Sequence, residues 1–297
     1  MPEIVEVRIF SDFINKHVGK NKLINIDILN GRYKTHGPFD NYNKFVNKLP
    51  LKLLDVKTKG KFMYMCYEND LYIGITLGLS GGYFYKKKNS DKYIHGYDNQ
   101  IVGSTVENNY VKNALDHLNV EFQFENGSIF FYDQLSFGTI KIFENKKELE
   151  DKLKTIGIDI MDPQTTLQLF TDKINKKTNH NKEIGAILLN QKLISGVGNY
   201  LRADTLWLSK ISPFRLIKNL STNDFEIIFN NIRLLTWSTY DYDEGVKLKI
   251  IDKKTKLPIN YKNEFLVYDR KVDILGNKIT KELLGDRHIY WVDGYQT

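Results

Sequence analysis

The hydrophobic pattern of this 297-residue chain changes its period along the sequence, and these changes constrain the fold more than any other feature. Residues 4–18 carry apolar side chains at near-helical spacing, whereas residues 23–143 consist of short β-rich runs separated by turns. Helical patterns then extend from residue 146 to about residue 240, and β patterning returns from residue 247. A run of strands followed by a run of helices predicts an α+β protein with more than one domain.

The β-rich region contains the clearest turn signal of the chain. The runs VEFQFE (120–125) and SIFFYD (128–133) flank the dipeptide Asn126-Gly127, which is typical of a tight β-hairpin. A similar β-rich run occupies residues 61–68. We therefore expect an N-terminal antiparallel β-sandwich that is preceded by one N-terminal helix.

Composition restricts the classes of function. The net charge of +7 favours a polyanionic partner such as nucleic acid, since positive charge attracts phosphates. Cys66 is the single cysteine, which excludes a disulfide scaffold and a zinc site built on cysteines, and the six histidines show no ligand spacing. No apolar run reaches the roughly 18 residues of a membrane helix, and the acidic residues of the N-terminus argue against a signal peptide. We expect an intracellular protein that needs no metal or other cofactor and does not enter a membrane.

The N-terminus Met1-Pro2-Glu3 is the first candidate site, with Glu6 one helical turn further on. If Met1 is removed, Pro2 becomes a secondary amine, and α-amino groups titrate at about pH 8, so a fraction is nucleophilic at neutral pH. Such an amine can attack a sugar C1′ and form an iminium intermediate, with Glu3 beside it for proton transfer. The alternative is an ordinary helix start, in which a proline and acidic residues in the first turn are common.

Two glycine-containing segments form the second candidate site. Gly60-Lys61 stands at a strand start, and the segment Leu-Gly-Leu-Ser-Gly occupies residues 77–81. Glycines allow close backbone approach to a ligand, and Lys61 can hold a phosphate as a point charge. The alternative is that the lysine is solvated and that the glycines only bend the sheet.

Residues 188–204 carry the strongest signal. Gly196 and Gly198 relieve steric limits on a turn between two predicted helices, and Asn199 is expected to cap the second helix. Backbone N–H groups at such a helix start form an anion site suited to a DNA phosphate. A simple helical hairpin connection is the alternative.

Together these motifs resemble those of the formamidopyrimidine-DNA glycosylase and endonuclease VIII family. Residues 188–204 resemble its helix-two-turn-helix signature. The other matching segments follow in family order: Pro2-Glu3, Gly60-Lys61, residues 77–81, and Asp133 with Phe137-Gly138. The resemblance implies a β-sandwich followed by a helix-two-turn-helix domain and a terminal finger.

The resemblance also implies an enzyme that removes damaged bases from DNA and then cuts the strand. Pro2 would attack C1′ of a flipped nucleotide, and Glu3 would protonate the sugar. The resulting Schiff base would undergo β- and then δ-elimination with help from Lys61. Glu6 is a further catalytic candidate because it lies one turn from the amine.

Residues that bind the phosphates flanking the lesion follow from the same resemblance. Asn199 and Arg287 would make these contacts, and the helix start at Gly198 would offer its anion site. For Arg287, the alternative is a solvated charge in a turn.

The C-terminal segment departs from the family, which typically ends in a zinc finger with four cysteines. Here the frame is kept without a cysteine, which is similar to the zincless finger of vertebrate endonuclease VIII-like enzymes, and Arg287 remains. We expect a terminal β-hairpin from the runs 264–270 and 288–295, separated by Gly276-Asn277. The side chains expected to hold it together are Tyr268, Ile289, Tyr290 and Trp291.

The side chains available for insertion into the DNA stack are also altered. Family members usually insert an arginine, a phenylalanine and a methionine, but this chain has no arginine between Arg32 and Arg202. Leu79 and Phe137 remain as apolar wedges, for which core packing is the alternative. We expect the missing arginine to relax discrimination of the base opposite the lesion.

The stretch 247–262 contains no glycine, whereas the purine-removing branch of the family has a glycine-rich loop there. With the zincless finger, this favours the endonuclease VIII-like branch, which acts on oxidised pyrimidines and hydantoins.

We expect a monomer with three parts that acts on damaged DNA, in duplex or single-stranded form. These parts are a catalytic sandwich (2–145), a helix-two-turn-helix domain (146–246) and a zincless finger (247–297).

Two other classes of function remain open. A catalytically silent DNA-binding protein could keep the fold, although binding alone does not need Pro2, Glu3 and Lys61 together. A helix-two-turn-helix RNA-binding protein is the second alternative, but it leaves residues 2–138 without an explanation. Borohydride trapping separates both from an enzyme, because only an iminium intermediate is reduced to a stable protein–DNA adduct.

Overall fold

The computed structural model describes residues 2–102, 109–240 and 265–297 of the chain. The glycine-free stretch 247–262, and with it the start of the predicted finger, lies outside the described residues. No helix within the described ranges is both long enough and apolar enough to cross a membrane.

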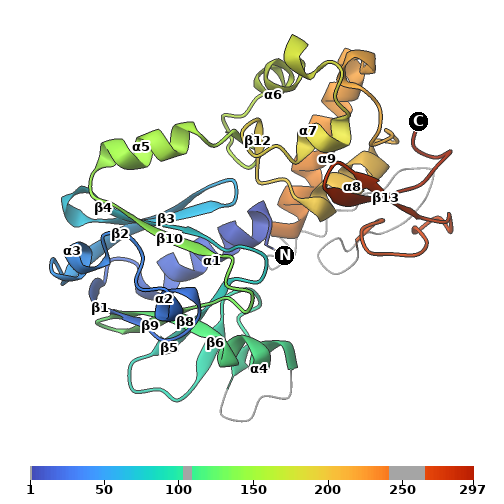
Figure 1. Ribbon diagram of the computed structural model, residues 1–297. Helices are drawn as coiled ribbons and strands as arrows, with labels where there is room; N and C mark the ends of the chain where they lie inside the picture. Colours follow the sequence, from blue (N-terminus) through green and yellow to red (C-terminus); the bar gives the residue numbers. More distant parts are fainter. Residues whose placement is uncertain (1, 103–108, 241–264) are drawn as a thin grey trace. The chain divides into compact units, whose positions relative to one another are not determined.

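The chain divides into two compact units (Figure 1). Unit 1 consists of Pro2 and Glu6–Thr155, and unit 2 consists of Glu3–Val5 and Ile156–Thr297. Helix α1 (Ile4–Val18) therefore begins among residues that pack with unit 2 and continues in unit 1. The finer division into sandwich, helix-two-turn-helix domain and finger stays a prediction.

The described residues of unit 1 form ten antiparallel strands, as the period of the hydrophobic pattern predicts. They pair in the order β10-β4-β3-β2-β1-β8-β9-β5-β6-β7, and Figure 1 shows them as two layers. The strands are β1 (Lys22–Ile28), β2 (Leu51–Lys59), β3 (Phe62–Tyr67), β4 (Leu71–Thr76), β5 (Gly82–Lys87), β6 (Tyr93–His95), β7 (Ile101–Val102), β8 (Leu118–Phe124), β9 (Gly127–Tyr132) and β10 (Thr139–Phe143). The shorter helices of this unit are α2 (Arg32–Thr35), α3 (Tyr42–Val46), α4 (Asn109–Asp116) and α5 (Lys146–Lys154).

One hydrophobic core receives side chains from strands in both halves of the strand order and from helix α1. Phe10 and Ile14 come from α1, where their four-residue spacing places them on one face. Met63 and Ile140 come from β3 and β10, and Phe122 comes from β8. The predicted N-terminal helix and antiparallel sandwich are thereby confirmed.

The predicted hairpin is present as well, with its turn one residue earlier than Asn126-Gly127. Strands β8 and β9 pair up to Phe124↔Gly127, so Glu125 and Asn126 form the two-residue turn. Gly127 has a φ of 155°, and a Cβ added to it would lie 2.4 Å from the carbonyl oxygen of Lys86. Glycine is required here because a larger residue would collide with the neighbouring strand β5.

Unit 2 contains the predicted helices and a terminal hairpin. The helices are α6 (Leu167–Ile174), α7 (Ile184–Leu188), α8 (Asn199–Leu208) and α9 (Thr222–Tyr240). A short parallel pair is formed by β11 (Ile158–Asp159) and β12 (Ile194–Ser195), and the antiparallel hairpin by β13 (Thr280–Leu284) and β14 (Arg287–Trp291).

The strands of the terminal hairpin differ from the prediction. Residues 265–270 form turns instead of a strand, and β14 pairs with β13. Three consecutive N–H groups, those of residues 266–268, donate to the buried carboxylate of Asp204 at 2.9–3.0 Å. N–H groups that converge on one carboxylate cannot alternate between two neighbouring strands, so this segment is not extended.

Candidate active site and DNA interface

The side chain of Glu3 is completely buried at the start of helix α8. Its Oε2 accepts the backbone N–H of Gly198 at 2.7 Å and that of Leu201 at 3.4 Å. Its Oε1 accepts the N–H of Tyr200 at 3.0 Å. The first N–H groups of a helix lack intrahelical partners and carry the positive end of its dipole, so they stabilise a carboxylate. The residue next to the predicted nucleophile Pro2 is therefore held in place.

The turn before α8 is held by hydrogen bonds of Gln191 and contacts Ile4, near the N-terminus. The side-chain amide of Gln191 donates to the carbonyl oxygens of Leu189 and Val197, and its Oε1 accepts the N–H of Gly196 at 2.9 Å. Gly196 accepts the N–H of Ile4 at 3.1 Å. With a φ of 100°, and with the side chain of Ile4 only 2.5 Å from where a Cβ would lie, this position requires glycine.

Two expectations about this turn are wrong. Asn199 does not cap α8, because Gly198 occupies the N-cap position and makes no side-chain bond there. The Oδ1 of Asn199 instead accepts from Nη2 of Arg202 at 3.0 Å. Three of the N–H groups at this helix start, which was expected to bind a DNA phosphate, are bound instead by the carboxylate of Glu3. A phosphate contact at Gly198 would thus need a group other than its N–H.

Pro2 and Glu6 lie on either side of this anchored segment. Pro2 precedes Glu3 directly and is partly buried, and Glu6 lies partly buried in the first turn of α1. Because neighbouring Cα atoms are about 3.8 Å apart, anchoring Glu3 also restricts the position of Pro2.

Lys61 lies at the tip of the hairpin between β2 and β3. The strands pair up to Lys59↔Phe62, so Gly60 and Lys61 form a two-residue turn in which Gly60 has a φ of 55°. The Nζ of Lys59 donates to the carbonyl oxygen of Leu153 at 2.8 Å, in the last turn of α5, where carbonyl groups lack helical partners. This bond joins the end of β2, just before the turn, to the end of α5.

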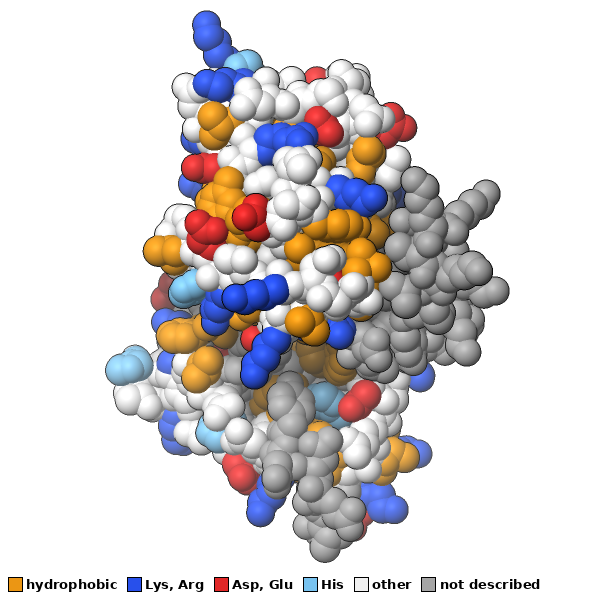
Figure 2. Space-filling view, turned by 90° about the vertical axis from the view of Figure 1, so that its right-hand side faces the viewer, with side chains coloured by type: hydrophobic (Ala, Val, Ile, Leu, Met, Phe, Trp, Pro, Cys, Tyr) orange, Lys and Arg blue, Asp and Glu red, His pale blue; other side chains and the backbone are white. Residues whose placement is uncertain are grey.

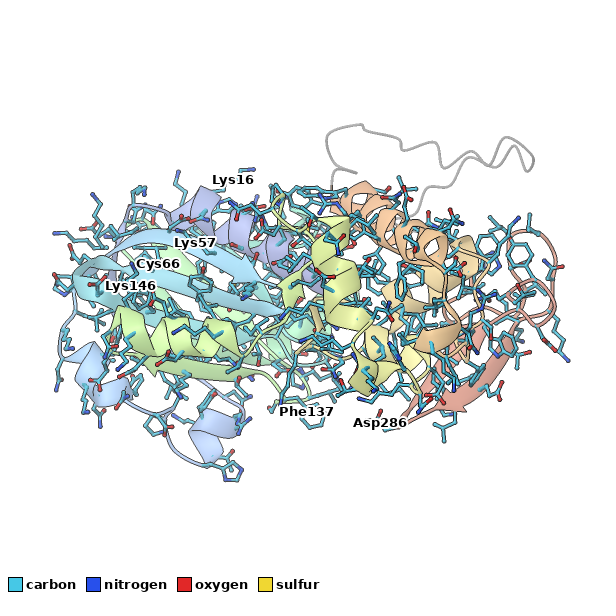
Figure 3. All side chains as sticks on the ribbon, turned by 90° about the horizontal axis from the view of Figure 1, so that it is seen from above. Lys16, Lys57, Cys66, Phe137, Lys146 and Asp286 are labelled. Carbon is cyan, nitrogen blue, oxygen red and sulfur yellow. The ribbon has the colours of Figure 1, made fainter. Side chains whose placement is uncertain are left out.

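The wedge candidates Leu79 and Phe137 are exposed, at 38% and 59%, so core packing does not account for them. Figure 3 shows Phe137 at the edge of unit 1. Their two loops are tied together by Asp133, which is 1% exposed. One oxygen of its carboxylate accepts from Oγ of Ser80 at 2.5 Å, and the other accepts the N–H of Gly138 at 2.6 Å.

Arg287 begins strand β14 directly after the two-residue turn Gly285-Asp286, in which Gly285 has a φ of 66°. Figure 3 shows Asp286 at the end of this hairpin. The side chain of Arg287 is exposed. The hairpin thus presents Arg287 at its tip, as Lys61 is presented at the tip of its own hairpin.

Arg202, a fully buried arginine on α8, connects the predicted phosphate-binding residues. Its Nη2 donates to Oδ1 of Asn199 at 3.0 Å and to the carbonyl oxygen of His288 at 2.9 Å, next to Arg287. Burial lowers the pKa of this guanidinium to about 10, an effect that the nearby carboxylate of Glu3 opposes. Arg202 therefore stays charged at neutral pH, and it links Glu3, Asn199 and the Arg287 hairpin in one cluster.

Sequence reasoning assigned no role to Arg202 or Asp204, although both are fully buried. Their signal is the composition of helix α8, in which two charged residues stand among apolar ones in the run LRADTLWL (201–208). A charged side chain on a buried helix face has to be paired, so such a pattern indicates polar contacts to another segment.

Figure 2 shows how the charged side chains are distributed on one face of the molecule. On the face shown in Figure 2, the described Lys and Arg side chains are scattered among hydrophobic and acidic ones and form no continuous patch. The described side chains on this face therefore do not form a uniformly basic surface.

Sequence comparison relates this chain to known proteins over most of its length. The formamidopyrimidine-DNA glycosylase N-terminal domain matches residues 1–140, and the formamidopyrimidine-DNA glycosylase H2TH domain matches residues 156–241. A formamidopyrimidine-DNA glycosylase of Ureaplasma parvum is 29% identical over 235 residues, which cover 77% of this chain and 74% of the relative. One from Wolbachia pipientis is 25% identical over 299 residues and covers 100% of both chains.

Solved structures share the fold. The Fpg protein of Lactococcus lactis in complex with DNA containing an abasic site has a TM-score of 0.74 at 20% identity, with 99% of each chain covered. Its complex with DNA containing an oxidised pyrimidine has a TM-score of 0.73 at 21% identity, with 100% of each chain covered. Both domains that define the family are present, in the family's order and over most of the sequence. The chain therefore belongs to the formamidopyrimidine-DNA glycosylase and endonuclease VIII family of DNA glycosylases.

Proposed function

We propose that this protein is a base-excision-repair DNA glycosylase with AP lyase activity, and that the amine of Pro2 is its nucleophile. The observation that carries the proposal is the burial of Glu3 against the start of α8, with three backbone N–H groups bound to its carboxylate. Binding alone would not require the chain terminus to be fixed in this way. A nucleophile at the terminus would, because reacting atoms need a defined approach.

In the proposed reaction, removal of Met1 frees the secondary amine of Pro2. The amine attacks C1′ of the damaged nucleotide, the base leaves, and an iminium links the enzyme to the sugar. β-Elimination and then δ-elimination cleave the strand on both sides of the sugar. Glu3 and Glu6 are the candidates for proton transfer, and Lys61 assists from the β2–β3 turn.

The proposed DNA contacts divide into phosphate binding and insertion. Arg287 and Asn199 are the candidates for the phosphates that flank the lesion, supported by the hydrogen bonds of Arg202 to Asn199 and to the carbonyl oxygen of His288, the neighbour of Arg287. Leu79 and Phe137 are the candidates for insertion, supported by their exposure on two loops that are tied together.

As substrates we propose oxidised pyrimidines and hydantoins. The absence of arginine between Arg32 and Arg202 supports a site that does not select for one opposing base. The proposal is supported by a complex of the Lactococcus lactis Fpg protein, which has the same fold, with DNA that contains an oxidised pyrimidine.

Borohydride trapping on a duplex with an abasic site tests the proposal. Protein with a processed N-terminus should form a covalent adduct, whereas protein that retains Met1 should not, because its Pro2 nitrogen is an amide. Variants with Pro2→Gly and Pro2→Thr mature termini show how far the reaction depends on the proline amine itself. Tight DNA binding without an adduct from processed protein would instead identify a catalytically silent DNA-binding protein.

A further inference from the structure

The terminal hairpin does not fit the zinc that the family typically holds there. Residues 265–297 contain no cysteine. Within the described part of the chain, no group of three or more His, Cys, Asp or Glu side chains is placed to hold a metal ion. Zinc in a structural site needs four such ligands, so another interaction has to hold the turns of this segment.

The first turn is organised by Asp273, whose side chain is buried at 3% exposure. Its Oδ1 accepts the N–H of Leu275 at 2.9 Å and that of Asn277 at 2.8 Å. Its Oδ2 accepts from the side-chain amide of Asn277 at 2.9 Å and from Nε1 of Trp207 at 3.0 Å. The carboxylate thus closes the turn at Gly276 and ties it to helix α8. Four donors satisfy both oxygens, so the charge is paired although it is buried.

The second turn is organised by Gln296, which is also 3% exposed. Its Oε1 accepts the N–H of Val292 at 2.8 Å, which closes the turn after β14. Its Nε2 donates to the carbonyl oxygen of Ile211 at 3.0 Å, just after helix α8. Gln296 and Asp273 therefore make the same pair of connections: each closes its own turn and fastens that turn to α8 or to the residues that follow it.

Helix α8 supplies a row of further polar contacts to the same segment. Asp204 binds the N–H groups of residues 266–268, and Arg202 binds the carbonyl oxygen of His288 at 2.9 Å. With Trp207, three buried residues of one helix thus hold the segment at separate points, and the contact to His288 lies next to Arg287.

We infer that Asp273 and Gln296 hold the two turns that flank the terminal hairpin, one before β13 and one after β14, in the place of a metal, and that Asp273 thereby positions Arg287 for DNA. The second part rests on the proposed function, in which Arg287 binds a phosphate. Asp273 is a positioning residue in this account, because it acts through the hairpin and does not touch the DNA. The hairpin should then need no zinc, and its DNA contact should depend on a buried carboxylate.

The first experiment tests the turns in the full-length protein. Asp273→Ala should remove the protection of the Leu275 and Asn277 N–H groups from hydrogen exchange. Trp207→Phe removes the donor to Asp273 and keeps an aromatic ring, which is smaller than the indole that stacks on Tyr295. It should loosen the turn even if Asp273→Ala fails to fold. Asp293→Asn, at an exposed acid of the second turn, is the control and should leave exchange unchanged. Unchanged protection in Asp273→Ala, or zinc bound one-to-one with a chelator-sensitive melting temperature, would overturn the inference.

The second experiment tests whether Asp273 acts through Arg287. Arg287→Ala should lower the slope of log affinity for abasic DNA against log salt by about 1, as expected for one lost phosphate contact. Trp207→Phe should lower the slope in the same direction, and the double variant should equal Arg287→Ala alone. Additive effects would contradict positioning through Arg287. An unchanged slope in Arg287→Ala would contradict the phosphate role of Arg287, while the exchange experiment would still decide the role of Asp273.

Discussion

At the scale of single residues, the buried charge of Glu3 joins the N-terminal segment, next to Pro2, to the start of helix α8. Its carboxylate accepts three N–H groups of the α8 start and is not exposed. Glu3→Gln replaces one acceptor oxygen by an NH₂ group that faces donors. Because a hydrogen bond to a charged group contributes about 2 kcal/mol, we expect a loss of that order in the free energy of unfolding.

The same variant should also lower the yield of borohydride trapping, since the position of Pro2 depends on Glu3. Denaturant unfolding and trapping on abasic DNA measure the two effects. Glu226→Gln, at an exposed acid on α9, is the matched control and should change neither. Normal stability together with normal trapping in Glu3→Gln would show that the anchor has no role.

His17 gives unit 1 a dependence on pH. Its ring stacks on Tyr85 at a centroid distance of 4.4 Å and packs on Phe13, and its buried Nε2 finds no hydrogen-bond partner among the described residues. Burial, with a smaller effect from Lys16, lowers the pKa of His17 below its usual value of 6.5. The unfolded chain therefore binds a proton more readily than the folded chain, so folding is favoured above pH 6.5 and weakened as the pH falls below it.

His17→Gln should remove this part of the pH dependence. The measurement is the free energy of unfolding between about pH 5 and pH 7, where histidine titrates. His36→Gln, at an exposed histidine, should leave the slope as it is in the wild type. An equal slope in His17→Gln and in the wild type would contradict the account.

At the scale of elements, the carboxylate of Asp133 holds two loops together through hydrogen bonds. It joins the loop of Leu79 to that of Phe137 through Ser80 and Gly138. Asp133→Ala should destabilise unit 1 by about 3 kcal/mol, because it leaves buried donors without an acceptor. It should also slow base removal from duplex DNA more than trapping on single-stranded abasic DNA, which needs no insertion. Gln134→Ala, at the exposed neighbour, is the control; equal effects on both substrates would argue against a joint wedge.

Prediction from sequence succeeded for elements whose signal is local. Helix α1, the hairpin of β8 and β9, and helix α8 follow from spacing, from Asn126-Gly127 and from the glycines before Asn199. The predicted strand over 264–270 was wrong, because the contacts that decide its conformation come from Asp204, about sixty residues earlier in the chain. The hydrophobic pattern of a segment does not indicate that a distant carboxylate binds three of its consecutive N–H groups.

In the candidate site, too, the sequence indicates positions with a local signal but not the contacts made by distant residues. Residue types and order predict Pro2, Glu3, Lys61 and the α8 turn as parts of the site, and their roles stay predictions. The partner of the α8 N–H groups was not predicted, because sequence alone does not show that the chain's own Glu3 fills the anion site before a phosphate can. The buried links made by Arg202 were missed for the same reason.

At the scale of the whole molecule, the absence of arginine between Arg32 and Arg202 affects how well the enzyme distinguishes the base opposite the lesion. Apolar wedges make no hydrogen bonds to a base, so cleavage rates of one lesion opposite each of the four bases should differ by less than about tenfold, or about 1.4 kcal/mol. Leu135→Arg, on the exposed loop of Phe137, adds such a donor and should increase the spread. Strong selectivity in the wild type would count against this reading.

The central claim, that the chain terminus is the nucleophile, is tested most directly by locating the adduct. Protein trapped with borohydride on abasic DNA is digested, and the peptide that carries the sugar remnant is identified by mass spectrometry. The account predicts that the remnant is on the nitrogen of Pro2 in the processed N-terminal peptide. A remnant on Lys61 or on any other lysine would contradict it.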